Sequence, residues 1–206
     1  VYSDDYTVVQ SIAVDEAGDV YIGGSGHGNI TFGDIEVEAG DRTPYIAKLS
    51  HNGSFLWGSA GFGGYGTVSD IEIGPDGSAY FAGSMHTNLI WDNLSLNSNG
   101  FQDSLFGKIG SDGSMEFISN DGGQETDSAS GIAVDDDHNL YVIGRFIGIA
   151  QLGNNTHITN QYDDIFVILF QDIDGDGTRN SEDDCLLISG SSSEGGVLGC
   201  DDSDDD

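Results

Sequence analysis

Basic residues are scarce in this sequence. Five lysines and arginines stand against 36 aspartates and glutamates among 206 residues, which gives a formal net charge of −31. A surface of that sign repels phosphate backbones and anionic lipid headgroups, so nucleic acid is excluded as an expected partner. The sequence also lacks any apolar run near the about 18 residues of a transmembrane helix, so we expect no membrane span in this chain.

Proline and cysteine are also rare, with two of each, whereas there are 32 glycines. Many glycines and few prolines favour short strands joined by tight turns. The spacing of Cys185 and Cys200 suits a disulfide formed in an oxidising compartment, as in secreted or cell-surface proteins. Two free thiols, or partners elsewhere in a longer chain, are the alternatives, and the absence of nearby histidines argues against zinc.

One pattern recurs three times with a period close to 60 residues. It reads SIAVDEAGDVYIGG from Ser11, SDIEIGPDGSAYFAG from Ser69 and SGIAVDDDHNLYVIG from Ser130. The aligned positions include three tyrosines and three glycines, namely Tyr21, Tyr80 and Tyr141, and Gly24, Gly83 and Gly144. A repeat of this length predicts one supersecondary unit per copy, stacked on its neighbours.

Each copy predicts a four-stranded antiparallel meander. In the second copy the strand-like runs are SDIEIG, SAYFAGS, SLFGKIG and SMEFIS, and the hairpin signals PDG and SDG join the first and last pairs. Such a sheet cannot bury both faces alone, and copies that stack radially form a β-propeller. We therefore expect an all-β chain with blades near residues 10–68, 69–129 and 130–170, the last one incomplete.

The residues also carry a family resemblance. The motif IAVDxxGxxYxxG, an apolar xxAKL strand, an NG or DG turn and an aromatic strand together resemble the bacterial and archaeal SBBP-type β-propeller repeats, over roughly residues 10–170. The resemblance implies a fold but little about activity, because propellers serve as lectins, scaffolds and enzymes. Closed propellers have about four to eight blades, and VYSDDYTVV resembles the end of a blade. We therefore expect further blades and domains in the same polypeptide.

Several repeated residues could carry chemistry, but each more readily serves the fold. They are the Asp-rich turns at residues 15–19 and 135–139; two histidines at equivalent positions, His27 and His86; two lysines at equivalent positions, Lys48 and Lys108; and the aromatic residues Phe32, Trp57, Trp91 and Phe117. Turn geometry, an ion pair at the sheet edge and core packing explain these residues without a ligand. Because no nucleophile, phosphate loop or cofactor motif accompanies them, we predict no catalytic residue.

The stretch DIDGDGTRNSEDDC, Asp172 to Cys185, places acidic residues at alternate positions in the register of an EF-hand calcium loop. Without flanking helices, its spacing DxDxDGxxNxxDxC resembles the thrombospondin type 3 repeat, an extracellular module in which the chain wraps calcium ions. The resemblance implies calcium ligands at the side chains of Asp172, Asp174, Asp176, Asn180 and Asp183 and at the backbone of Thr178. A second loop would begin with Asp202, Asp204 and Asp206. The alternative for residues 171–206 is an acidic linker without fixed structure.

The features together favour a non-enzymatic, calcium-binding repeat protein that is secreted or held at the cell surface. Its blades would bind a glycan or an extracellular protein in adhesion, or would act as a spacer, while calcium orders the acidic segment. The alternative is a fragment of a secreted propeller enzyme, a hydrolase or lyase that acts on polysaccharide. Convergent carboxylates on neighbouring blade loops would favour the enzyme.

Overall fold

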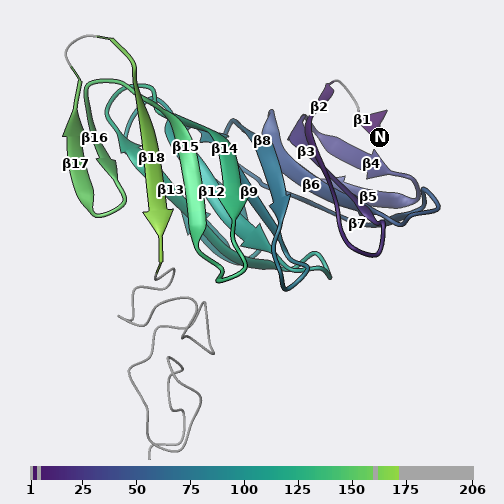
Figure 1. Cartoon of the computed structure of the whole chain (residues 1–206). Helices are drawn as coiled ribbons and strands as arrows, with labels where there is room; N and C mark the ends of the chain where they lie inside the picture. The colour runs from purple at the N-terminus through teal and green to yellow at the C-terminus, as the bar shows by residue number, and fades with distance from the viewer. Residues whose placement is uncertain (1, 4–5, 160–161, 172–206) are drawn as a thin grey trace, which may run out of the picture.

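The computed structural model of the chain describes residues 2–3, 6–159 and 162–171. The described strands form five sheets, and the three sheets that contain the blades follow one another along the chain and stack face to face (Figure 1). The described residues form strands, turns and loops without a helix, so this part of the chain holds no helix that could cross a membrane. The prediction of an all-β chain built from four-stranded antiparallel blades is confirmed.

Each sheet begins as a meander of neighbouring strands, and we refer to the three sheets as blades 1, 2 and 3. Blade 1 contains β2 (Thr7–Val14), β3 (Val20–Gly26), β6 (Thr43–Leu49) and β7 (Phe55–Ala60). Blade 2 contains β8 (Gly66–Ile73), β9 (Ala79–Met85), β12 (Asp103–Ile109) and β13 (Met115–Gly123). Blade 3 contains β14 (Ser128–Val134), β15 (Leu140–Phe146) and β18 (Asp164–Phe170) in the described residues.

The Asp-rich turns owe their shape to side-chain hydrogen bonds, as the sequence predicted. In blade 1, the Asp15 carboxylate accepts hydrogen bonds from the backbone N–H groups of Ala17 at 3.0 Å and Asp19 at 2.9 Å. The equivalent Asp135 of blade 3 accepts the backbone N–H groups at the matching positions. These aspartates therefore cap hairpin turns, which accounts for their recurrence.

A short hairpin interrupts each blade between its second and third strands, and the sequence did not predict it. The hairpins are β4 (Asn29–Phe32) with β5 (Ile35–Glu38), β10 (Leu89–Trp91) with β11 (Leu94–Leu96), and β16 (Ile149–Leu152) with β17 (Asn155–Ile158). Each hairpin also pairs with a preceding segment. The end of β13 pairs with β16, Phe62 forms a bridge to Ile90, and β1 (Tyr2–Ser3) pairs with β4. The hairpins therefore link one blade to the next.

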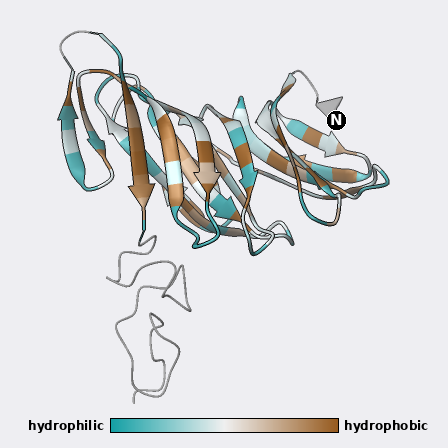
Figure 2. Cartoon of the chain, viewed as in Figure 1, coloured by the Kyte–Doolittle hydropathy of each residue, from teal (hydrophilic) through white to brown (hydrophobic). Residues whose placement is uncertain are grey.

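Two apolar layers lie between the blades and form the core. The first layer packs Tyr21 and Ile46 of blade 1 against Val68, Ile71 and other residues of blade 2. The second layer is built in the same way from blades 2 and 3 and includes Phe106 and Ile132. In Figure 2, hydrophobic residues recur in bands along the strands that face these layers. Burial of these bands is the main force that holds the blades together.

The repeated aromatic residues serve packing, as predicted. Trp91 is fully buried in the first layer, and the partly buried Trp57 and Phe117 pack against the first and second layers. Phe32 is fully buried in a third apolar cluster, which blade 1 forms with its own hairpin. The Trp91 indole N–H donates to the Ser59 hydroxyl at 2.8 Å and so joins blade 2 to blade 1. These side chains are therefore not exposed as a platform for sugar rings.

Candidate ligand-binding pocket

The residues that the sequence singled out for calcium all lie outside the described residues. They are Asp172, Asp174, Asp176, Thr178, Asn180 and Asp183, the second set Asp202, Asp204 and Asp206, and the two cysteines Cys185 and Cys200. Their roles stay predictions. Among the described residues, no group of three or more His, Cys, Asp or Glu side chains is placed to hold a metal ion.

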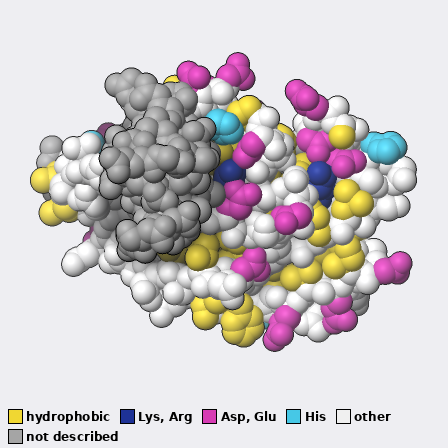
Figure 3. All heavy atoms as spheres, turned by 90° about the horizontal axis from the view of Figure 1, so that it is seen from below, with side chains coloured by type: hydrophobic (Ala, Val, Ile, Leu, Met, Phe, Trp, Pro, Cys, Tyr) yellow, Lys and Arg dark blue, Asp and Glu magenta, His cyan; other side chains and the backbone are white. Residues whose placement is uncertain are grey.

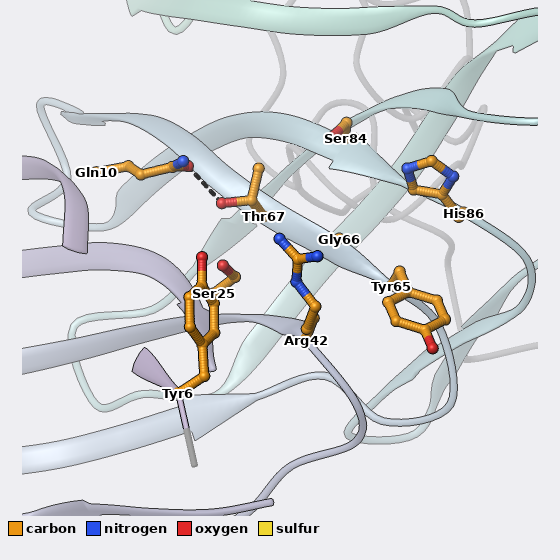
Figure 4. Close-up of a pocket in the computed structure, with 9 residues that line it drawn as sticks. All are labelled: Tyr6, Gln10, Ser25, Arg42, Tyr65, Gly66, Thr67, Ser84 and His86. Carbon is orange, nitrogen blue, oxygen red and sulfur yellow. Dashed lines mark hydrogen bonds between the residues drawn. The ribbon is translucent and has the colours of Figure 1, made fainter. Parts of the chain in front are cut away.

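A polar pocket of about 400 Å³ lies between blades 1 and 2 (Figure 4). Its wall consists of Tyr6, Gln10, Ser25, Arg42, Tyr65, Gly66, Thr67, Ser84 and His86. Two tyrosine rings, one guanidinium group, one imidazole and several hydroxyl groups are thus gathered at one site. None of these lining residues is acidic, although the chain as a whole is strongly acidic.

The repeat itself brings the two tyrosines and the histidine to this place. Tyr6 and Tyr65 precede the first strands of blades 1 and 2 at equivalent positions. The carbonyl of Tyr6 accepts the backbone N–H of His27 at 2.9 Å, and the carbonyl of Tyr65 accepts that of His86 at 2.6 Å. Both histidines therefore lie at the same end of their blades, as their spacing predicted, but they face different hollows. His86 lines the pocket, and His27 lines an adjoining hollow.

Arg42 is the basic residue of the pocket, and its position is unusual. It adopts a left-handed backbone conformation with φ of 55° just before β6. Its guanidinium group lies 5.2 Å from the centre of the Tyr6 ring, a cation–π distance, and Figure 4 shows it between the rings of Tyr6 and Tyr65. The stacked ring orients the guanidinium while its N–H donors stay accessible from the pocket.

The other described basic residues all pair with carboxylates. Lys48 contacts Asp15 at 3.0 Å, Lys108 contacts Asp76 at 2.8 Å, and Arg145 contacts Asp163 at 3.0 Å. Arg42 differs from these three residues. Within the described part of the chain, no carboxylate oxygen lies within 4.0 Å of an Arg42 nitrogen.

The neighbouring Asp41 carboxylate is engaged elsewhere. It accepts the Tyr65 hydroxyl at 2.6 Å and lies 3.4 Å from His27 Nε2. The hydrogen bond to Asp41 raises the pKa of the Tyr65 phenol, so this phenol stays protonated at neutral pH. Among the described residues, the pocket therefore presents one cation that no carboxylate pairs with, beside neutral hydroxyl groups. That set of groups suits a polar ligand with an anionic group.

The pocket differs in charge from the equivalent place in the next junction. At the equivalent place between blades 2 and 3, two buried aspartates fill the space. Asp127 accepts the backbone N–H groups of Gly123 at 2.6 Å and Ile147 at 3.0 Å, and Asp103 accepts that of Asn99 at 2.7 Å. The residues aligned with Asp127 and Asp103 are Gly66 and Thr43. The junction of blades 1 and 2 therefore carries no carboxylate at these two positions.

The repeated lysines lie at the opposite end of the blades and are structural. Lys108 Nζ contacts Glu116 at 2.7 Å as well as Asp76, and Lys48 also contacts Asp19 at 3.5 Å. The predicted ion pairs at the sheet edge are thus confirmed. Figure 3 shows this end of the molecule with many acidic and few basic side chains. An acidic hollow between the turns of the three blades lies here as well.

Sequence reasoning missed the pocket because its main residue does not recur. Arg42 aligns with Gln102 in blade 2 and with Asp163 in blade 3, so comparison of the copies did not select it. A signal was nevertheless present. Arg42 is one of only five basic residues in the whole sequence, and a cation retained in so acidic a chain is a candidate for a ligand contact.

Comparison with known families gives one match. Residues 2–31 match the model of SBBP, a beta-propeller repeat, and this segment spans β1, β2, β3 and most of β4. No curated protein matches the sequence. The match supports the predicted propeller repeat over this part of the chain and agrees with the antiparallel blades. It names no ligand and no activity, and the thrombospondin type 3 resemblance stays a prediction.

Proposed function

We propose that this chain is a non-enzymatic binding module of an extracellular or cell-surface protein, and that the pocket between blades 1 and 2 binds a glycan that carries a carboxylate. The observation that supports this proposal is Arg42, a guanidinium that pairs with no carboxylate of the described residues and lies beside two tyrosines and several hydroxyl groups. A planar guanidinium binds a carboxylate through two parallel hydrogen bonds, and hydroxyl and imidazole groups suit the sugar.

The acidity of the chain narrows the ligand further. With a net charge of −31, the chain repels every charge of a polyanion that comes within about one Debye length of its surface. The Debye length is about 8 Å at physiological ionic strength. A single carboxylate in contact with Arg42 avoids most of that repulsion. We therefore propose an otherwise neutral oligosaccharide with one uronic acid, in preference to a polyuronate.

The pocket offers little to support the enzymatic alternative. Hydrolysis of a glycosidic bond ordinarily uses two carboxyl groups on either side of the bond. No Asp or Glu belongs to the described residues that line the pocket. A binding role fits this lining better than the hydrolase or lyase role that the sequence left open.

Calorimetric titration tests the proposal with three ligands: a neutral oligosaccharide, the same oligosaccharide ending in glucuronate, and polygalacturonate. Arg42→Asn removes the charge and suits the left-handed backbone, because asparagine tolerates positive φ. We expect Arg42→Asn to weaken glucuronate binding by about tenfold or more, which corresponds to about 1.4 kcal/mol. The matched control is Arg145→Asn, because Arg145 pairs with Asp163 far from the pocket. Equal weakening by both variants, or undiminished binding by Arg42→Asn, would contradict the proposal.

We also propose that the acidic segment binds calcium through Asp172, Asp174, Asp176, Thr178, Asn180 and Asp183, and that Ca²⁺ there is structural. The support is the register of the oxygen donors, because alternate carboxylates repel each other unless a cation lies between them. Limited proteolysis with and without a chelator tests this. We expect calcium to slow cleavage within residues 172–206, whereas equal rates in both conditions would refute the proposed role.

A further inference from the structure

A second hollow, of about 350 Å³, adjoins the pocket between blades 1 and 2. We call it the Asp41 hollow, because Tyr6, His27, Asp41 and Arg42 line it. Tyr6 and Arg42 also line the pocket, so the Tyr6 ring and the guanidinium 5.2 Å from its centre separate the two spaces. Ligand sites commonly measure about 300–1,000 Å³, and a space at the lower end of that range suits a single sugar residue.

The two spaces differ in charge. The described residues that line the pocket include Arg42 and no acid, whereas the hollow adds Asp41, whose side chain is 55% exposed. Asp41 and Arg42 are adjacent in sequence, but their charged groups do not come within 4.0 Å of each other. A ligand that extends from the pocket into the hollow therefore meets a guanidinium at the boundary and a carboxylate beyond it.

The Asp41 carboxylate is held in place and still has acceptor positions to offer. Its Oδ2 atom accepts the Tyr65 hydroxyl at 2.6 Å, and its Oδ1 atom lies 3.4 Å from His27 Nε2. A carboxylate has about four acceptor positions, so these two contacts orient the group without using all of them. The positions that remain suit the hydroxyl groups of a sugar, which donate hydrogen bonds. A second carboxylate on the ligand would be repelled there.

The repeat does not require an acid at this position. Strand register aligns Asp41 with Phe101 in blade 2 and Tyr162 in blade 3. In blade 2, the Phe101 ring packs edge-on against His86 with 5.4 Å between the ring centres. In blade 1, the Asp41 carboxylate faces the equivalent His27 instead. The blade thus accommodates an aromatic ring here, and the acid gives the hollow of blade 1 a negative charge that the fold does not need.

We propose that the Asp41 hollow is a second subsite, which takes a neutral sugar residue linked to the uronic acid and rejects a second uronic acid through Asp41. The inference rests on the proposed binding of one uronate at Arg42. A uronate followed by a neutral sugar places its carboxylate at Arg42 and hydroxyl donors at Asp41. Two linked uronates bring a carboxylate toward Asp41, and an unfavourable contact of this kind is an effective source of specificity.

Calorimetric titration of the whole chain with three ligands tests the subsite. The ligands are methyl glucuronide, which occupies the pocket alone, a disaccharide of glucuronate and glucose, and a disaccharide of two glucuronates. The variant is Asp41→Asn, which removes the charge and keeps an oxygen that can accept the Tyr65 hydroxyl. The matched control is Asp34→Asn, because Asp34 lies in the turn between β4 and β5 and lines neither space.

We expect the wild type and Asp34→Asn to bind the glucuronate–glucose disaccharide about tenfold more tightly than the disaccharide of two glucuronates. Asp41→Asn should lose most of this preference and bind methyl glucuronide nearly as the wild type does, which would show that the pocket is intact.

Two sets of results would overturn the inference, and they differ in what they say about the pocket. If methyl glucuronide binds in a manner that Arg42→Asn weakens, but the wild type shows no preference between the disaccharides or Asp41→Asn keeps it in full, the subsite is wrong and the proposed function stands. If methyl glucuronide does not bind, or binds Arg42→Asn equally well, the proposed function fails and the subsite fails with it.

Discussion

Asp121 is held by the fold in surroundings that disfavour its charge. Burial raises the pKa of its carboxyl group, and the nearby Asp103 raises it further. The backbone N–H of Gly153 donates to Asp121 Oδ2 at 2.5 Å and lowers the pKa, but by less than the other two effects raise it. A carboxyl whose pKa is higher in the folded than in the unfolded state binds its proton more tightly when folded. Its contribution to stability is therefore lost as the pH rises through the folded pKa.

Asp121→Asn should remove this dependence. The amide oxygen keeps the acceptor for Gly153 and carries no charge, so we expect a higher midpoint of thermal unfolding than the wild type at pH 7. The difference should shrink as the pH falls through the folded pKa and should vanish below about 4, where the aspartate is protonated in both the folded and the unfolded state. Calorimetric scans from pH 3 to pH 7 provide the measurement.

Asp112→Asn is the control with the opposite sign. The Asp112 carboxylate accepts the backbone N–H and the hydroxyl of Ser114, and these hydrogen bonds lower its pKa. Its stabilising effect is present above the unfolded pKa and is lost as the pH falls through the folded pKa. The asparagine variant should therefore be less stable than the wild type at pH 7. If both variants shifted in the same direction, burial would not be the cause of the Asp121 effect.

Lys108 is a second residue whose role can be tested alone. Its ammonium group lies between Asp76 at 2.8 Å and Glu116 at 2.7 Å, and its own side chain is nearly buried. Lys108→Met would leave the two carboxylates facing each other. Because both carboxylates are partly exposed, we expect a loss of roughly 1–3 kcal/mol of unfolding free energy, below the value for fully buried pairs.

Urea denaturation at pH 7 measures the effect of Lys108→Met, and the double variant Lys108→Met/Glu116→Gln tests its cause. The second change removes the repulsion between the carboxylates, so it should recover part of the loss. If the double variant were less stable than the single one, lost packing of the lysine stem would be the larger effect.

At the scale of the strands, one glycine recurs in every blade for a steric reason. A Cβ atom at Gly24, Gly83 or Gly144 would lie about 2 Å from the carbonyl oxygen of Val8, Thr67 or Ser128 on the first strand. The register of that strand shifts next to each of these contacts. The glycine therefore allows the bulged first strand to approach the second one closely.

Gly83→Ala should destabilise the chain by about 3 kcal/mol or more, because backbone atoms rather than a flexible side chain occupy the space. Gly77→Ala is the matched control. Gly77 has a φ of 77° but no atom within 4 Å of its added Cβ, so the change should cost only the backbone strain of about 1–2 kcal/mol. Chemical denaturation compares the two. Similar losses at both positions would show that close approach is not the constraint at Gly83.

The elements also show what the sequence could predict. Period, alternation and turn residues sufficed for the strands of the three blades, since a strand of six to nine residues carries a clear pattern. The hairpin strands, such as β10 with three residues, are too short for alternation to identify. The pocket at Arg42 could not be predicted in the same way. Whether a carboxylate lies close enough to pair with the Arg42 guanidinium is set by how strands distant in sequence pack in space.

At the scale of the whole molecule, charge is the dominant feature. A formal charge of −31 on a folded chain creates repulsion that salt relieves, since the Debye length falls from about 30 Å at 0.01 M to about 3 Å at 1 M. The midpoint of thermal unfolding should therefore rise with NaCl concentration. Screening of this kind depends on ionic strength and not on the identity of the cation.

Calcium should act in a different way if residues 172–206 hold the proposed loop. Extracellular sites of this type have dissociation constants of about 0.1–1 mM. Calcium near these concentrations adds little to the ionic strength of a buffer that already contains about 0.15 M NaCl. We expect tyrosine or tryptophan fluorescence to report little change at such concentrations, because calcium adds little screening to that of about 0.15 M NaCl. Calorimetric titration with calcium should nevertheless show saturable heat.

The double variant Asp174→Ala/Asp176→Ala separates the two effects of cations. It removes two of the proposed ligands and only two of 36 acidic residues, so the response of the unfolding midpoint to NaCl should be nearly unchanged. The saturable heat of calcium binding should disappear, because a loop with a single alternate carboxylate left at its start cannot replace the hydration shell of the ion. Undiminished calcium binding by this variant would mean that calcium only screens the acidic surface, and the predicted loop would be wrong.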